Sequence, residues 1–284
     1  MTSIRLAHSP DADDAFMFWA ATTGRIDTEG LSFEVVRADT EALNALAEIE
    51  GADVVAISIA QYARVADRYL LLPHGGSVGE GYGPVVVSMR PASNVVLEGA
   101  RIGVPGLRTT AYLVLRILLP RFTPVVLPIS PHEAVFDALQ AGTVDAALLI
   151  HEGRLTFESR GLHRILELGE AWHTRTGLPL PLGGNVIRRA LGADVVALTS
   201  RVLGRSIAYA LEHRDLAMDA ILASPVAARA RLDRPTLDRY LAMYANERTL
   251  DYGPDGRRAI SEVLAEAHLA GLCERLVTPQ FAEG

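Results

Sequence analysis

The residues His151, Glu152 and Arg154 follow directly on an apolar run, residues 146–150, and place a proton acceptor beside two charged side chains. An imidazole with an ordinary pKa of about 6.5 is suited to proton abstraction near neutral pH. A histidine that follows an apolar run is also commonly a hydrogen-bonded side chain at the edge of the core. Both interpretations stay open at this point, and His151 is the candidate general base.

A second polar segment, residues 8–14, follows the first apolar run and precedes a helix-like segment. Ser and Asp at a helix start satisfy free amide groups and interact favourably with the helix dipole. Carboxylates at 11, 13 and 14 could also bind a metal, but the spacing of a calcium loop and a second acidic run are absent. We therefore expect no metal site, and Asp14 is a candidate for substrate contact.

Two adjacent threonines, Thr109 and Thr110, follow the apolar run 102–104 and open another helix-like segment. Hydroxyls beside the free amides of a helix N-terminus suit the binding of a carboxylate or a hydroxyl of a small ligand. Ordinary N-capping by Thr109 is the alternative, and it leaves Thr110 unexplained. Both interpretations stay open.

Several common chemistries are excluded by sequence. All 27 basic residues are arginine, so there is no P-loop lysine, no Schiff-base lysine and no pyridoxal anchor. The glycine-rich run 75–83 precedes an apolar strand-like segment instead of a helix, which rejects a dinucleotide-binding fingerprint. The GxSxG pattern at 75–79 lies in the same run and likewise precedes no helix, so it is not expected to form a nucleophile elbow, and no HExxH motif occurs. We therefore expect no cofactor.

The composition indicates a folded protein and argues against several kinds of partner. The chain has 284 residues, of which 49% are hydrophobic, and a formal net charge of -7. This charge argues against a nucleic-acid partner. The single cysteine, Cys273, allows no intrachain disulfide, and no apolar leader or membrane-length run is present. We expect a cytoplasmic protein with no membrane insertion, and a homo-oligomer stays open.

Alternation of apolar runs with helix-period segments predicts an α/β fold with a largely parallel sheet. The predicted strands cover residues 4–7, 31–36, 54–57, 84–88, 102–104, 124–127, 146–150 and 184–187. Between them we predict helices over residues 13–23, 40–49, 110–118 and 131–141. From residue 194 to about 272 the pattern is helical.

Two segments echo each other. Residues 41–58 and 133–151 each predict a helix that ends at Gly, a turn Asp, and a buried strand followed or ended by a polar residue, Ser58 in one and His151 in the other. Ligands bind beyond the carboxyl ends of strands in open α/β sheets. Such units are common in α/β proteins, so the echo alone does not decide between a site and ordinary architecture.

Two Gly- and Pro-rich clusters, residues 75–83 and 176–184, are candidate hinges. A chain that crosses to a second domain near 87–93 and returns near 182–187 would form a two-lobed clamshell with two crossovers. We predict one large lobe from residues 1–90 and 186–284, and a small lobe from 91–185. Such a clamshell encloses a small-molecule substrate.

Four motifs resemble the 1,4-dihydroxy-6-naphthoate synthases of the futalosine route to menaquinone. They occur in order over nearly the whole chain: SPDADDAF at 9–16, GLRTTAY at 106–112, LIHEGRLTF at 149–157 and TGLPLPLG at 176–183. The resemblance implies the fold of type II periplasmic-binding proteins. It also implies a lyase that converts cyclic dehypoxanthine futalosine to 1,4-dihydroxy-6-naphthoate and releases dihydroxyacetone, without metal or organic cofactor.

The resemblance also implies roles for individual residues. His151 would be the general base, Thr109 and Thr110 would hold the substrate, and Ala56, Ile57 and Ser58 would line the pocket. Some relatives carry lysine where this chain has Ala56, so Arg154 or backbone amides would replace that charged contact. Two alternatives stay open: the chorismate dehydratase of the same pathway, and a solute-binding protein without catalysis.

Overall fold

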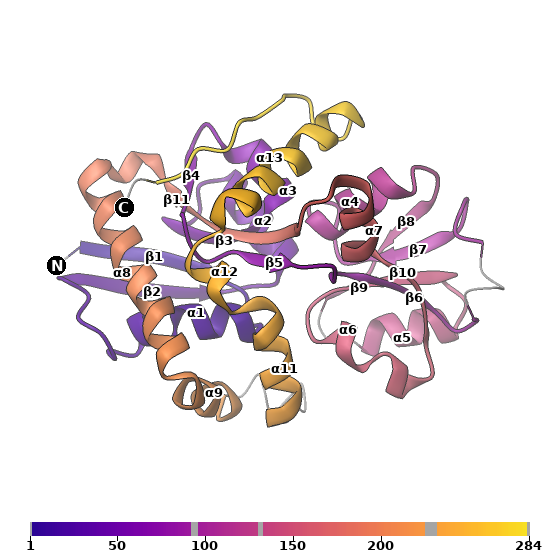
Figure 1. The fold of residues 1–284 in the computed structure, drawn as a ribbon, viewed down its shortest axis with the longest axis horizontal. Helices are drawn as coiled ribbons and strands as arrows, with labels where there is room; N and C mark the ends of the chain where they lie inside the picture. Colours follow the sequence, from indigo (N-terminus) through magenta and orange to yellow (C-terminus); the bar gives the residue numbers. More distant parts are fainter. Residues whose placement is uncertain (1, 92–95, 130–132, 225–231, 283–284) are drawn as a thin grey trace.

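Two β-sheets lie side by side, each flanked by helices (Figure 1). The computed structural model describes residues 2–91, 96–129, 133–224 and 232–282. The first sheet has the order β2-β1-β3-β11-β4, with β5 also paired to β11. Its strands are β1 (Thr2–His8), β2 (Leu31–Arg37), β3 (Val54–Ser58), β4 (Tyr69–Leu71), β5 (Ser77–Gly79) and β11 (Leu180–Arg188). The second sheet has the order β10-β6-β9-β7-β8 and contains β6 (Val85–Ser88), β7 (Arg101–Val104), β8 (Thr123–Val126), β9 (Ala146–Leu149) and β10 (His163–Glu167).

The helices divide between two lobes, each built around one sheet (Figure 1). The first lobe contains α1 (Ala12–Thr22), α2 (Thr40–Glu48), α3 (Ile59–Val65), α8 (Ala193–Glu212), α9 (Arg214–Leu222), α11 (Arg234–Tyr244), α12 (Glu247–Leu250) and α13 (Gly253–Leu269). The second lobe contains α4 (Thr110–Leu118), α5 (Glu133–Gln140), α6 (Gly153–Thr156) and α7 (Leu168–Thr176). In the part of the chain that the structure describes, no helix is both long and apolar enough to cross a bilayer.

Every predicted strand overlaps an observed one, and the predicted helices at 13–23, 40–49 and 110–118 correspond to α1, α2 and α4. The predicted helix 131–141 starts outside the described residues, and its remainder corresponds to α5. The helical C-terminal region is also confirmed, as α8 to α13. The short strands β4, β5 and β10 were not predicted from the sequence.

Both sheets repeat one pattern of strands. Two parallel ladders join β2-β1-β3 in the first sheet and β8-β7-β9 in the second. Beside each unit lies an antiparallel strand, β11 next to β3 and β6 next to β9. Each of these strands enters its sheet after the chain has crossed from the other lobe. The prediction of a largely parallel sheet is therefore wrong for β6 and β11, because a fully buried apolar run carries no signal of strand direction.

The chain changes sheets earlier than the predicted boundaries at 90/91 and 185/186. The strand Val85–Ser88 pairs with β9 and β10 of the second sheet. The return crossing precedes β11, which pairs with β5 from Leu180 onward. The crossings thus lie between Gly79 and Val85, and between Thr176 and Leu180. Each crossing overlaps one of the Gly- and Pro-rich clusters: the first follows β5 near the end of 75–83, and the second lies at the start of 176–184, within which β11 begins.

One apolar core runs from the first lobe into the second. It joins Ile57 and Tyr62 of the first lobe to Val104 and Val114 of the second, and it includes Trp172 of α7. Trp172 is fully buried, and its indole donates a hydrogen bond to the carbonyl of Pro179 in the return crossing, at 3.2 Å. This packing fixes the lobes relative to each other and so positions the space between them.

Candidate active site

A cavity lies between the lobes, at the carboxyl ends of β1, β3 and β9. Its empty space, with the open mouth included, is about 750 Å³, a size suited to a small ligand. All eight candidate residues named from the sequence line this cavity: Asp14, Ala56, Ile57, Ser58, Thr109, Thr110, His151 and Arg154.

The echo between the two helix–strand units corresponds to equivalent places in the two sheets. Ser58 ends β3 and His151 follows β9, and each of these strands lies between a parallel partner and an antiparallel one. Ser58 is held within its own lobe: its amide donates to Asn44 Oδ1 at 2.9 Å, and its hydroxyl accepts from Asn44 Nδ2 at 3.2 Å. Both polar strand ends face the cavity.

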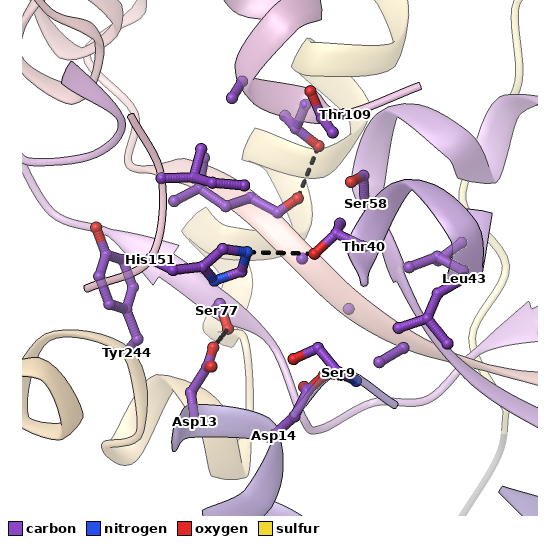
Figure 2. A pocket seen from close by; sticks show the side chains of 18 of the residues that line it. Ser9, Asp13, Asp14, Thr40, Leu43, Ser58, Ser77, Thr109, His151 and Tyr244 are labelled. Carbon is purple, nitrogen blue, oxygen red and sulfur yellow. Dashed lines mark hydrogen bonds between the residues drawn. The ribbon is translucent and has the colours of Figure 1, made fainter. Parts of the chain in front are cut away.

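His151 points from the second lobe toward the first (Figure 2). Its Nε2 lies 3.2 Å from the Thr40 hydroxyl, at the start of α2. Its Nδ1 lies 3.4 Å from the hydroxyl of Tyr240 in α11, and 3.4 Å from Oδ2 of Asp11. The backbone of His151 has a φ of 51°, in the left-handed region that non-glycine residues rarely adopt. The chain thus bends sharply after β9 and turns the imidazole into the cavity.

Carboxylates around His151 set the electrostatics of the site. Burial disfavours the imidazolium, but the negative charges of Asp11, Asp13, Glu152 and Asp14 outweigh it and raise the pKa of His151 above 6.5. Burial and the neighbouring Asp13 raise the pKa of Asp14 to about 8. Burial and Asp11 raise the pKa of Glu152 to about 7. The cluster therefore combines a base with carboxyl groups that can hold protons near neutral pH.

The first turn of α1 forms the floor of this cluster (Figure 2). Asp13 accepts hydrogen bonds from the hydroxyls of Ser77, at 2.7 Å, and Tyr240, at 3.3 Å. Burial raises the pKa of Asp13. Asp14 accepts a hydrogen bond from the Ser9 amide at 2.8 Å. Asp11 is the N-cap residue of α1, but its side chain makes no capping hydrogen bond. Helix capping therefore does not account for the carboxylate of Asp11.

The hydroxyls of the two threonines are bonded within the protein. Thr109 is the N-cap of α4: its hydroxyl accepts from the amide of Tyr112 at 3.1 Å and donates to the carbonyl of Gly106 at 2.9 Å. The Thr110 hydroxyl donates to the carbonyl of Leu182 at 2.7 Å and accepts from the amide of Ala60 at 3.1 Å, both in the first lobe. The Thr110 hydroxyl thus joins the two lobes. With both threonine hydroxyls bonded within the protein, the first backbone amides of α4 are the groups that can bind a ligand here.

Arg154 lines the cavity but directs its guanidinium to the first crossing. Its Nη2 donates to Glu167 at 2.8 Å, and its Nε donates to the carbonyl of Gly83 at 2.6 Å. Glu167 in turn accepts from the Gly83 amide at 2.6 Å. Arg154 and Glu167 are 9% and 7% exposed, so this is a buried ion pair that fastens the crossing segment. A charged contact between Arg154 and a substrate would compete with these bonds.

Sequence reasoning missed several residues of the cavity. Thr40, Tyr240 and Tyr244 line the cavity. Thr40 and Tyr240 contact His151, from which they are separated by 111 and 89 residues of sequence. Of these residues, only Thr40 carries a sequence signal, because it stands at the start of a predicted helix. Tyr240 lies among apolar helix residues and carries none. Among the described residues, no three His, Cys, Asp or Glu side chains are grouped to hold an ion.

Comparison with solved structures agrees with the two-lobed architecture. A crystal structure of a protein from Archaeoglobus fulgidus is similar with a TM-score of 0.88 and 41% identity, covering 95% of this chain and 98% of that one. A Candida albicans protein with the generic periplasmic binding protein fold covers all of this chain and 99% of its own at a TM-score of 0.72 and 14% identity. The predicted type II periplasmic-binding-protein-like clamshell is confirmed.

Comparison with characterised sequences gives the family. The 1,4-dihydroxy-6-naphthoate synthase of Thermus thermophilus is 37% identical over 281 residues, which cover 99% of this chain and 100% of the relative. A family model for menaquinone biosynthesis matches residues 4–268. The chain therefore belongs to the menaquinone biosynthesis family.

Proposed function

We propose that this protein is a lyase of menaquinone biosynthesis that converts cyclic dehypoxanthine futalosine to 1,4-dihydroxy-6-naphthoate and releases dihydroxyacetone. The observation that carries the proposal is the similarity to a 1,4-dihydroxy-6-naphthoate synthase over the full length of both chains, at 37% identity. The buried imidazole in the cavity supports an enzyme over a solute-binding protein, because binding alone requires hydrogen bonds and no group that titrates near neutral pH.

His151 acts in this proposal as the general base. It accepts the acidic proton of the substrate, and the electron pair moves from carbon onto a neighbouring carbonyl oxygen as an enolate. The enolate oxygen needs hydrogen-bond donors, for which the first amides of α4 and the neutral carboxyl of Asp14 are the available groups. Thr40, Tyr240 and Asp11 orient the imidazole.

The same residues account for a reaction without added cofactors. As the bond to the dihydroxyacetone fragment breaks, the protonated His151 returns its proton to that fragment, so no atom is gained or lost. Formation of an aromatic diol is strongly downhill, so a positioned base and donors to one oxygen supply what the reaction needs. Thr109 and Thr110 act through their backbone and through the shape of the helix start. Ala56, Ile57 and Ser58 line the opposite side. We propose a cytoplasmic location, as suits a biosynthetic enzyme with a small-molecule substrate.

The test is an assay of the purified protein with each candidate substrate. We expect cyclic dehypoxanthine futalosine to yield equimolar 1,4-dihydroxy-6-naphthoate and dihydroxyacetone, identified by mass spectrometry, in the presence of a chelator. Chorismate should be returned unchanged. Dehydration of chorismate would assign the sibling activity instead. Saturable binding of cyclic dehypoxanthine futalosine without any product would support a solute-binding protein and refute the proposal.

A further inference from the structure

The side-chain amide of Asn185 lies in the cavity wall without a partner. Asn185 is 1% exposed and lines the cavity, yet neither its Nδ2 nor its Oδ1 makes a hydrogen bond with any of the described residues. Buried amides are normally bonded on both sides, as Asn44 is with Ser58. A buried polar group that is left unpaired is costly to the free protein, and in the wall of a cavity a bound ligand can pair it.

The residues beside the amide of Asn185 are small. Asn185 on β11 lies directly opposite Ala56 on β3 in an antiparallel ladder, so both side chains stand on the same face of the sheet. Ala56 contributes only a methyl group there. On another side, a Cβ added to Gly75 would lie 2.1 Å from Asn185 Nδ2, so only glycine leaves room for the amide. Two of the smallest residues thus flank the amide, and both line the cavity.

The chemistry around Asn185 selects a neutral ligand group that can donate and accept. A primary amide offers two N–H donors and one carbonyl acceptor, which matches a hydroxyl or a hydroxyketone. Nearby, Ser77 is paired with Gly183 on the same strand β11 and donates its hydroxyl to Asp13. A carboxylate on this acidic side would meet repulsion, whereas the helix N-terminus at Thr110 favours negative charge. The two sides of the cavity therefore favour different ends of a ligand.

We propose that Asn185 is a substrate-binding residue that holds the hydroxyl-bearing fragment of the substrate, the part that leaves as dihydroxyacetone. This assignment rests on the function proposed above. From the neighbouring strand β11, Asn185 supplies the polar contact that the methyl group of Ala56 cannot make. Arg154 can therefore keep its ion pair with Glu167 and need not make this contact with the substrate.

The test compares Asn185→Leu and Asn185→Ser with Thr199→Val. The leucine side chain keeps the branching of asparagine at Cγ, is somewhat larger and removes its polarity, and serine keeps one polar group in a smaller side chain. Thr199 is the matched control: it is fully buried on α8, its hydroxyl also has no partner among the described residues, and it does not line the cavity. Folding of each variant is followed by its thermal unfolding midpoint.

We expect Asn185→Leu to lower kcat/KM by about 5- to 100-fold, the usual effect of leaving a ligand group without its hydrogen bonds. Inhibition by dihydroxyacetone should weaken in parallel, while the inhibition constant of 1,4-dihydroxy-6-naphthoate stays unchanged. Asn185→Ser should lie between Asn185→Leu and the wild type, and Thr199→Val should match the wild type. Unfolding midpoints should stay near that of the wild type, because the amide makes no internal hydrogen bond.

Other outcomes overturn the assignment. An unchanged kcat/KM in folded Asn185→Leu removes the contact, and equal weakening of naphthoate inhibition assigns the amide to the other end of the substrate. Loss of stability with normal turnover per folded molecule makes Asn185 a structural residue. If the wild type itself does not convert the substrate, the proposed function fails. Binding of dihydroxyacetone to wild type and Asn185→Leu, measured by ligand-observed NMR, then decides the contact separately, and equal binding refutes it.

Discussion

Replacing His151 by alanine and by glycine separates the chemistry of its imidazole from the conformation of its backbone. Both variants remove the side chain that lies against Thr40, Tyr240 and Asp11. They differ in the backbone, because His151 has a φ of 51° and only glycine adopts that region without steric cost. Any difference in stability between the two variants therefore measures the strain held at this turn.

The structure fixes the expected sign and size. The left-handed region costs a non-glycine residue about 1–2 kcal/mol. Glycine is normally less stable than alanine by about 0.5–1 kcal/mol, because its unfolded chain is more flexible. The difference leaves His151→Gly more stable than His151→Ala by up to about 1.5 kcal/mol, the reverse of the usual order. Both variants should lose about 10²- to 10⁴-fold in turnover, the usual contribution of a positioned general base.

Urea unfolding without substrate measures the first quantity, and steady-state turnover of cyclic dehypoxanthine futalosine measures the second. The catalytic reasoning is wrong if either variant keeps wild-type turnover. The strain argument is wrong if His151→Gly unfolds at a lower urea concentration than His151→Ala. The two results are independent, because the unfolding experiment contains no substrate and the turnover ratio is measured on folded protein.

Two further predictions follow from the contacts of the site. Because only the neutral imidazole accepts a proton, turnover should fall as pH drops through the raised pKa of His151. Asp11→Asn removes one of the charges that raise that pKa, so this limb of the pH–rate profile should move to lower pH; an unmoved limb would show that another group limits the rate. Thr110→Val leaves the carbonyl of Leu182 and the amide of Ala60 without their partner and should lower the free energy of unfolding by about 1–3 kcal/mol, with Thr110→Ser close to wild type. Urea unfolding checks it, and equal stability of the valine and serine variants would contradict it.

The sequence predicted those parts of the site that local patterns encode. A polar residue at the end of an apolar run marks the carboxyl end of a buried strand, which is how Ser58 and His151 were found. The two threonines mark a helix start in the same way. The orientation of the threonine hydroxyls was not predictable, because their partners Leu182 and Ala60 lie in the other lobe and no local pattern specifies them.

Features that depend on distant parts of the chain escaped prediction. The antiparallel insertion of β6 and β11 follows from the crossings between lobes, and a buried apolar run has the same pattern in either direction. Tyr240 lies on the buried face of α11 with Leu237 and Leu241, so its periodicity is that of a core residue. Its contact with His151 exists only in the folded chain.

Ser58 and His151 stand at equivalent strand ends of the two sheets but differ in function. The difference follows from which lobe supplies the groups that contact each residue. Ser58 receives its bonds from Asn44 in its own lobe, so its position does not depend on the second lobe. His151 lies in the second lobe, yet the groups nearest its ring, Thr40, Asp11 and Tyr240, all belong to the first. The orientation of the imidazole and the raised pKa are therefore properties of the two lobes together. A base built in this way is complete only where the lobes meet around the substrate.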